Sequence, residues 1–179
     1  MPGNKSRNIL FVILWLFTLS AVGADRVSSL ENPRTRLLAP EISLPEINVF
    51  TKNTFFKLSE LKGKLVIVNF WSLDCVPCLT EMGSLNRLSR EYFSDGLRVV
   101  AIAVNNSAQE IRAYQKEKKW SFRMLVDPHR EIRKLYEVDA IPVSYIIGRD
   151  GRFVARVKGS RNWFSADIRR QIEIFLKSR

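Results

Sequence analysis

Two cysteines three positions apart are the residues in this chain best suited to covalent chemistry. Cys75 and Cys78 are the only cysteines among the 179 residues, and they follow the apolar run 65–71. Such a run predicts a strand buried on both faces, and the stretch after it predicts a helix whose first turn carries both sulfur atoms. Residues three apart on a helix have Cβ atoms about 5–6 Å apart, and a disulfide accepts Cα separations of about 4.4–6.8 Å. The spacing therefore predicts a pair that can form a disulfide without moving the backbone.

The start of a helix should affect the ionisation of the two thiols unequally. Unpaired N–H groups and the positive end of the helix dipole stabilise an anion there, so we expect the thiol of Cys75 to ionise more readily than a free thiol. Cys78 lies one turn further in and suits the role of resolving thiol. A zinc site is an alternative, but it needs four ligands, and the chain has no second cysteine pair and one histidine, His129. A structural disulfide without redox activity is the other alternative, although closing so short a loop removes little entropy from the unfolded chain.

The first 24 residues have the pattern of an export signal. Lys5 and Arg7 precede an apolar run that begins at Ile9, and small residues at 22–24 offer a cleavage site. The run 9–22 is shorter than the roughly 20 residues that a membrane span requires, so we expect a cleaved signal peptide. A retained N-terminal membrane anchor over residues 9–24 is the alternative. Export places the cysteines in an oxidising compartment, the periplasm or the extracytoplasmic face of the membrane.

Composition and patterning predict a single globular domain after this N-terminal segment. Residues 25–39 show no sustained period and predict a linker, which leaves residues 40–179 as the globular part. The formal charge is +11, from 29 basic and 18 acidic residues, and the basic residues are dispersed. We expect most of them on solvated faces, with attraction to anionic lipid or to an acidic partner as the alternative. No basic stripe alternates with aromatic residues, so nucleic acid is not an expected partner.

Strand and helix patterns alternate through the globular part. A short hairpin is expected over residues 42–49 and 54–58, followed by a turn that Ser59 caps. Strands are predicted at residues 65–71, 97–104, 122–126, 143–147 and 153–157, and helices at residues 76–93, 108–119, 129–137 and 163–177. This order predicts an α/β fold in which a central mixed β-sheet is flanked by helices on both sides.

These motifs together resemble the thioredoxin-like fold in its exported TlpA/ResA-type branch, within the redoxin or AhpC/TSA-like superfamily. The resemblance rests on Asn69-Phe70-Trp71 before the Cys-Val-Pro-Cys motif, on Glu81 after it, and on Ile141-Pro142 further along. It extends from about residue 40 to the C-terminus. It includes the N-terminal segment around residues 39–64 and the inserted helix and strand at 108–126, which distinguish this branch from plain thioredoxin.

The resemblance implies an exported thiol:disulfide oxidoreductase that reduces protein disulfides. Cys75 would attack the client disulfide and Cys78 would resolve the mixed disulfide, with no metal and no organic cofactor. The implied clients are disulfide-bearing proteins, with apocytochrome c of c-type cytochrome biogenesis among them. Electrons would come from a membrane donor of the DsbD or CcdA type.

The same resemblance implies a client-binding surface around the cysteines. Pro142 corresponds to the cis-proline that faces the sulfur atoms in this family. A cis bond at that position would turn the backbone of Ile141 outward, where its N–H and C=O groups can pair with an extended client strand. Trp71, Asp74 and Pro77 complete the substrate-binding residues that we expect.

The first departure from the family pattern concerns the residue that accepts a proton. Asn69 stands where plain thioredoxin has a buried aspartate, so that proton acceptor is absent. Glu81, one turn beyond Cys78, is the candidate replacement and the third expected catalytic residue. A carboxylate on the solvated face of the helix is the alternative interpretation of Glu81.

Three further departures lie close to the motif. Asp74 replaces the tryptophan that usually precedes the nucleophile, and its charge should oppose a thiolate at Cys75. Gly83 replaces a helix-kinking proline and should cost about 1 kcal/mol relative to alanine in a helix. Val143 replaces the usual threonine after the cis-proline, which removes a hydroxyl from the neighbourhood of the sulfur atoms.

Two related classes of protein are weighed as alternatives. A peroxiredoxin-like peroxidase needs a hydroxyl three residues before its reactive cysteine and a proline further upstream; Ser72 meets the first requirement, but Val68 stands at the second position. A Sco-like copper-delivery protein uses a wider cysteine spacing and a later histidine. His129 follows Pro128 in an expected helix-capping turn, where a surface residue is the simpler interpretation.

Overall fold

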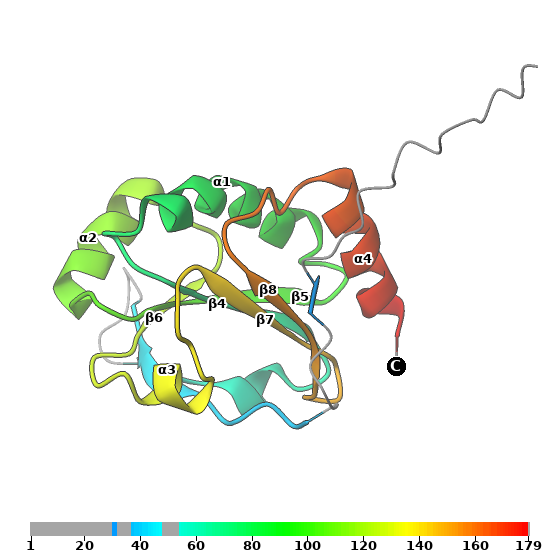
Figure 1. The fold of residues 1–179 in the computed structure, drawn as a ribbon, viewed down its shortest axis with the longest axis horizontal. Helices are drawn as coiled ribbons and strands as arrows, with labels where there is room; N and C mark the ends of the chain where they lie inside the picture. Colours follow the sequence, from blue (N-terminus) through cyan, green and yellow to red (C-terminus); the bar gives the residue numbers. More distant parts are fainter. Residues whose placement is uncertain (1–29, 32–36, 48–53, 179) are drawn as a thin grey trace, which may run out of the picture.

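A mixed sheet forms the centre of the molecule in the computed structural model, which describes residues 30–31, 37–47 and 54–178 (Figure 1). Over these residues the sheet has eight strands in the order β1-β8-β7-β4-β5-β6-β2-β3. The strands are β1 (Leu30–Glu31), β2 (Ser43–Glu46), β3 (Thr54–Lys57), β4 (Leu65–Trp71), β5 (Leu97–Ala103), β6 (Arg123–Val126), β7 (Val143–Ile147) and β8 (Phe153–Lys158). The helices are α1 (Val76–Glu91), α2 (Ala108–Lys118), α3 (Glu131–Leu135) and α4 (Ala166–Lys177), and η1 (Leu58–Leu61) is a 3-10 helix.

Strand β4 lies in the middle of the sheet and leads directly to the cysteines. It pairs in parallel with β5 and antiparallel with β7, and all seven of its residues are buried. The predicted strand over residues 65–71 is therefore confirmed in position and in burial. A strand covered on both faces has no polar side to alternate with an apolar one, which explains the near-continuous apolar run.

Two hydrophobic cores lie on opposite faces of this sheet. Alternate residues of β4 point to opposite faces, so Leu65 and Ile67 enter one core while Val66 and Val68 enter the other. The first core includes side chains of α1, α2 and α4, and the second includes side chains of α3 and η1. Figure 1 shows the same division, with α1 and α2 above the sheet and α3 below it. The α/β architecture with helices on both sides is confirmed.

The N-terminal hairpin joins the sheet at its far edge. Strands β2 and β3 are antiparallel, as predicted, and Glu46 of β2 pairs with Leu125 of β6. The end of the first predicted strand, residues 48–49, and the turn expected around residues 52–53 lie outside the described residues. The prediction that Ser59 caps the next turn is wrong: η1 begins at Leu58, and the Glu60 side chain instead accepts the backbone N–H of Lys57 at 3.2 Å.

Two helices begin later than the sequence pattern predicts. Helix α3 starts at Glu131 because the buried carboxylate of Asp127 accepts the backbone N–H groups of Glu131 at 3.0 Å and Arg133 at 2.8 Å. This interaction caps the helix, as an acidic side chain does at an N-terminus. Helix α4 starts at Ala166, because residues 163–165 form the turn that leads into it.

The segment predicted as a linker contributes to the opposite edge of the sheet. Strand β1 pairs antiparallel with β8, and Leu38 forms an isolated bridge with Arg152. Part of the range 25–39 therefore pairs along β8. The predicted signal or anchor lies outside the described residues, and the domain boundary at residue 40 stays a prediction. None of the helices in the described part of the chain has the length and apolar character needed to cross a membrane.

Candidate active site

The two cysteines form a disulfide at the start of helix α1. The Cα atoms of Cys75 and Cys78 are 5.2 Å apart, and Cys75 is the N-cap residue of the helix. The sulfur of Cys75 accepts the backbone N–H of Cys78 at 3.2 Å. Pro77 fits between them at no cost in hydrogen bonding, because N–H groups in the first turn have no acceptor within the helix. The helix therefore directs a hydrogen-bond donor at the sulfur of Cys75.

Exposure differs sharply between the two sulfur-bearing residues. Cys78 is fully buried in the first core, whereas Cys75 is half-buried. The surface beside Cys75 is formed by Asp74, Val76 and Pro77, which are exposed, with Val76 at 73%. A second protein can therefore reach Cys75 and not Cys78 while the fold stays intact.

Asn106, which sequence reasoning missed, fixes the turn before the helix. Its Oδ1 accepts the hydroxyl of Ser72 at 3.1 Å and the backbone N–H of Leu73 at 2.8 Å, and the side chain is buried. The Ser72 hydroxyl also accepts the backbone N–H of Asp74 at 3.3 Å. The available signal was the polar stretch 105–107 that follows the buried strand β5. Ser72, whose hydroxyl stands where a peroxiredoxin-like peroxidase needs one, is hydrogen-bonded within this turn and helps to shape it.

The peptide bond between Ile141 and Pro142 is cis, as the family resemblance implied. Strand β7 begins one residue later and runs antiparallel to β4, with Val143 opposite Phe70. This register brings Pro142 beside the end of β4, from which the chain continues to Cys75. Pro142 is buried and Ile141 is half-buried, packing against both cores. The pairing of the two strands thus joins parts of the motif that are far apart in the sequence.

Trp71 lies beneath the site and not on its surface. Its side chain is fully buried, and its ring packs against Tyr114 with centroids 5.4 Å apart. The expected contact between Trp71 and a substrate is not available in this packing, because its position in a strand covered on both faces leaves none of the side chain exposed. The exposed residues at this site come from the turn and the first turn of α1.

Glu81 is buried, with 2% of its surface exposed, so its placement on a solvated helix face is wrong. Its Oε1 accepts a hydrogen bond from Asn69 Nδ2 at 2.8 Å. Its Oε2 accepts two, from the backbone N–H of Arg161 at 2.9 Å and from Trp163 Nε1 at 3.1 Å. Three donors from β4 and from the segment before α4 therefore hold the carboxylate inside the protein.

Burial raises the pKa of Glu81 above its ordinary value of 4.5. The hydrogen bonds from Arg161, Asn69 and Trp163 and the positive charge of Arg161 act in the opposite direction, but desolvation is the larger effect. A carboxyl group with a raised pKa exchanges its proton closer to neutral pH. This is the property that a proton acceptor for a thiol requires.

Sequence reasoning missed the segment that supplies two of these donors. Ser84 on α1 accepts the backbone N–H of Trp163 at 3.0 Å, which fastens the segment to the helix. Trp163 is itself 1% exposed. A tryptophan in this segment is an ordinary core residue by its sequence pattern, so no local signal marked it as a partner of Glu81.

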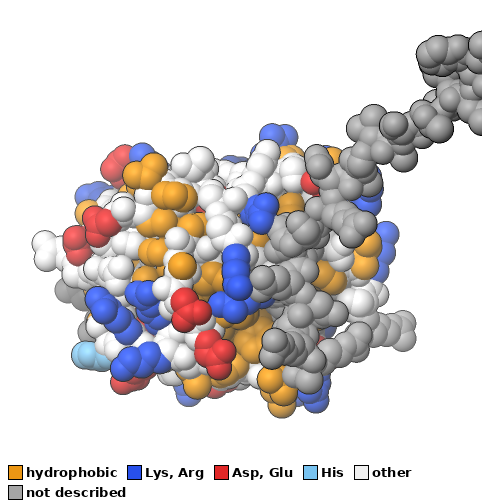
Figure 2. All heavy atoms as spheres, in the orientation of Figure 1, with side chains coloured by type: hydrophobic (Ala, Val, Ile, Leu, Met, Phe, Trp, Pro, Cys, Tyr) orange, Lys and Arg blue, Asp and Glu red, His pale blue; other side chains and the backbone are white. Residues whose placement is uncertain are grey.

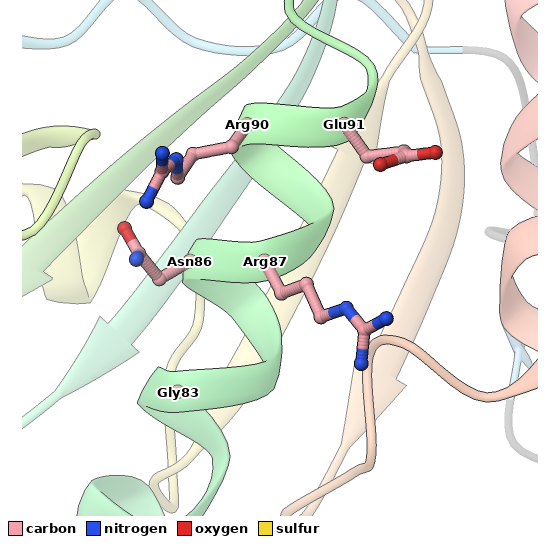
Figure 3. Close-up of a pocket in the computed structure, with 5 residues that line it drawn as sticks. All are labelled: Gly83, Asn86, Arg87, Arg90 and Glu91. Carbon is pink, nitrogen blue, oxygen red and sulfur yellow. The ribbon is translucent and has the colours of Figure 1, made fainter.

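A separate hollow of about 580 Å³ lies further along α1, away from the sulfur atoms (Figure 3). Asn86 and Arg90 point to one side of the helix there, and Arg87 and Glu91 point to the other. Figure 2 shows basic side chains interspersed with acidic and apolar ones on the face in view.

His129 is exposed in the turn before α3. Across the described residues, no three His, Cys, Asp or Glu side chains lie close enough together to hold a metal ion.

Known proteins of the same fold carry thiol-disulfide chemistry. The thiol-disulfide oxidoreductase ResA of Bacillus cereus (strain ATCC 10987 / NRS 248) is 28% identical over 178 residues, which cover 97% of each chain. ResA of Bacillus subtilis (strain 168) is 30% identical over 110 residues, which cover 62% of each chain. Among solved structures, a thiol:disulfide interchange protein of the thioredoxin family from Chlorobium tepidum TLS superposes with a TM-score of 0.70. It is 25% identical, and the match covers 80% of this chain and 99% of that one.

The fold, the Cys75–Cys78 disulfide and these relatives define a thiol-disulfide oxidoreductase of the TlpA/ResA type. Residues 37–156 match the model of the AhpC/TSA family, and the chain belongs to that family.

Proposed function

We propose that the protein is an exported reductase of protein disulfides. The thiolate of Cys75 attacks one sulfur of a client disulfide, and the other client sulfur leaves as a thiolate that takes up a proton. Cys78, as a thiolate, then attacks Cys75 in the mixed disulfide and releases the second client thiol. The protein becomes oxidised to the Cys75–Cys78 disulfide, and the client gains the two electrons.

The unequal exposure of the two cysteines is the observation that carries this mechanism. The half-buried Cys75 accepts the N–H of Cys78, and a hydrogen bond to an anionic acceptor is stronger than one to a neutral acceptor. That contact favours the thiolate of Cys75 once the pair is reduced. The buried Cys78 meets only the mixed disulfide that Cys75 forms, which suits a resolving thiol.

Glu81 serves in this proposal as the acceptor for the proton of Cys78. The two residues lie on the same face of α1, three positions apart, and both are buried. The raised pKa of Glu81 supports proton exchange with a thiol. The exposed residues Asp74 and Pro77, with the backbone of Ile141 beside Pro142, form the proposed surface for a client strand.

Residues 1–24 act in this proposal as the export signal, which places the domain in the periplasm or on the extracytoplasmic face of the membrane. A dithiol in an oxidising compartment needs an electron source, and a membrane donor of the DsbD or CcdA type would supply it. Apocytochrome c is the proposed client class, in line with the resemblance to TlpA/ResA-type proteins. Residues 25–39 would connect the signal or a retained anchor to the domain over residues 40–179.

The direction of electron flow is tested by the reduction potential of the pair, measured by equilibration with thiol–disulfide mixtures. We expect a value nearer to thioredoxin, at roughly −270 mV, than to the strong oxidant DsbA, at roughly −120 mV. A value above about −180 mV, which is typical of disulfide isomerases, would contradict a reductase. Clients are then identified by trapping mixed disulfides in cells with Cys78→Ser, with the double variant lacking Cys75 as the matched control.

A further inference from the structure

Three successive backbone N–H groups in the turn between β4 and α1 have hydrogen-bond acceptors. The N–H of Leu73 donates to Asn106 Oδ1 at 2.8 Å. The N–H of Asp74 donates to Ser72 Oγ at 3.3 Å, and the N–H of Cys75 donates to Ser72 O at 3.2 Å. The Ser72 hydroxyl in turn donates to Asn106 Oδ1 at 3.1 Å. Ser72 therefore closes the turn, and Asn106 Oδ1 fastens it to another part of the chain.

Asn106 is itself held in place by the residues on either side of it. Two residues before it, the N–H of Val104 donates to Trp71 O at 3.1 Å, which continues the pairing of β5 with β4. The residue after it, Ser107, is the N-cap of α2 and forms a capping box with Glu110. The side chain of Asn106 is buried, where a hydrogen bond is electrostatically stronger than in water. Asn106 is thus a fixed point against which the turn is held.

The disulfide holds Cys75 in place only while the cysteine pair is oxidised. In that state the Cα atoms of Cys75 and Cys78 are 5.2 Å apart. After reduction, Cys75 keeps the first hydrogen bond of α1, in which its C=O accepts the N–H of Leu79 at 3.1 Å. The end of a helix opens at little cost in free energy. The position of Cys75 in the reduced protein therefore depends on the hydrogen bonds of the turn before it.

We propose that Asn106 is a positioning residue that keeps this turn closed when the disulfide is open, so that Cys75 stays within reach of Cys78. In the mixed disulfide, the thiolate of Cys78 attacks the sulfur of Cys75. The bond between Cys75 and the client sulfur breaks, and the client leaves as a thiolate. A turn that opens lowers the effective concentration of one cysteine at the other.

The two redox states should depend on Asn106 to different extents. The oxidised protein requires the closed turn, because a disulfide tolerates only a narrow range of Cα separations. The reduced protein can relieve the loss of the hydrogen bonds to Asn106 by opening the turn. Removal of the amide oxygen therefore destabilises the oxidised form more than the reduced form. The Cys75–Cys78 disulfide should become easier to reduce.

The test is equilibration of the full chain with mixtures of reduced and oxidised glutathione at pH 7. Asn106→Ala should lower the equilibrium constant for forming the disulfide about two- to tenfold, the range expected from the loss of one net hydrogen bond. A tenfold change makes the reduction potential less negative by about 30 mV. Asn86→Ala is the matched control and should leave the constant unchanged. Asn86 Oδ1 likewise accepts a backbone N–H and a hydroxyl, both from Ser121 at 2.8 Å, but it lies further along α1 from the sulfur atoms.

A purely structural role for Asn106 would lower the stability of both redox forms equally and leave the reduction potential where it is. That result in a folded Asn106→Ala protein would overturn the inference, as would a more negative potential or an equal shift in Asn86→Ala. If Asn106→Ala does not fold, Ser72→Ala decides, because it removes the hydroxyl between Asn106 and the N–H of Asp74 and keeps the bond from Leu73. Its potential should also become less negative, and an unchanged value would refute the role of the turn.

Asn106 acts on the Cys75–Cys78 pair whichever way electrons flow, so its role does not depend on export, on Glu81 or on the proposed reductase activity. Glutathione takes the place of the client in this measurement. A failure of client reduction in a separate assay therefore leaves the result for Asn106 interpretable.

Discussion

Trp163→Phe should make the stability of this protein depend more steeply on pH. The substitution removes the indole N–H that donates to Glu81 Oε2 at 3.1 Å, and both side chains are almost fully buried. The smaller ring also leaves unfilled space, which costs stability at every pH. The hydrogen bond is the part that varies with pH, because it is stronger when Glu81 is ionised.

The size of the effect follows from the two charge states of Glu81. A hydrogen bond is worth about 1.5–3 kcal/mol when one partner is charged and about 0.5–1.5 kcal/mol when both are neutral. The variant should therefore lose about 1–1.5 kcal/mol more at neutral pH than in acid. Because the lost donor favours the ionised form, the pKa of Glu81 should rise further above its ordinary value in the variant.

The sign of the pH dependence follows from linkage. Burial raises the pKa of Glu81 above 4.5, so the folded protein binds this proton more tightly than the unfolded chain does. The contribution of Glu81 to stability is most favourable below the unfolded pKa. It falls as the pH rises through the folded pKa, beyond which it is constant. Trp163→Phe extends this decline to higher pH.

The measurement is urea unfolding of the oxidised protein between pH 4 and pH 8, in the wild type and in two variants. Trp71→Phe is the matched control, because Trp71 is equally buried in the same core but its Nε1 has no hydrogen-bond partner among the described residues. The loss in free energy of unfolding caused by Trp71→Phe should be the same across this pH range. A pH-independent cost for Trp163→Phe, or equal pH slopes for the two variants, would refute the reasoning.

Three other predictions concern the helix and the cysteines. Gly83→Ala should raise the free energy of unfolding by about 1 kcal/mol, because Gly83 is exposed inside α1 and nothing lies within 4 Å of an added Cβ; thermal unfolding checks this, and Gly151→Ala, at a φ of +79°, should instead destabilise. In the reduced protein, Cys75 should be alkylated well before Cys78 at neutral pH, since only Cys75 is accessible; mass spectrometry showing faster labelling of Cys78 would reverse their roles. Asp74→Asn should make the reduction potential less negative, because it removes a charge that opposes the thiolate; an unchanged or more negative potential would contradict this.

Sequence reasoning succeeded where the determining interactions are local or follow from burial alone. The strand over residues 65–71 and the position of Cys75 at the start of a helix follow from hydrophobic patterning and from the residues beside it. Strand β7 matches its predicted bounds for the same reason. The first residues of α3 and α4 were placed too early, because side-chain caps and turns set a helix start more strictly than periodicity does.

The environment of Glu81 is the clearest case that patterning did not resolve. Its spacing from Cys78, Met82 and Leu85 places it on the buried stripe of α1, which was a usable signal for burial. Spacing cannot say which donors meet a carboxylate once it is buried. Without known donors, a solvated position was an equally good interpretation.

The amino-acid sequence by itself determined the chemistry available to this protein: one cysteine pair, its place after a buried strand, and the α/β order that builds the sheet. Tertiary structure alone decided the proton environment. Asn69, Arg161 and Trp163 lie 12, 80 and 82 residues from Glu81, and they meet it only because β4 and the segment before α4 pack against α1. The physical reason is that strand and helix patterns arise from neighbouring residues, whereas the solvation and hydrogen bonding of a buried charge depend on every element packed around it.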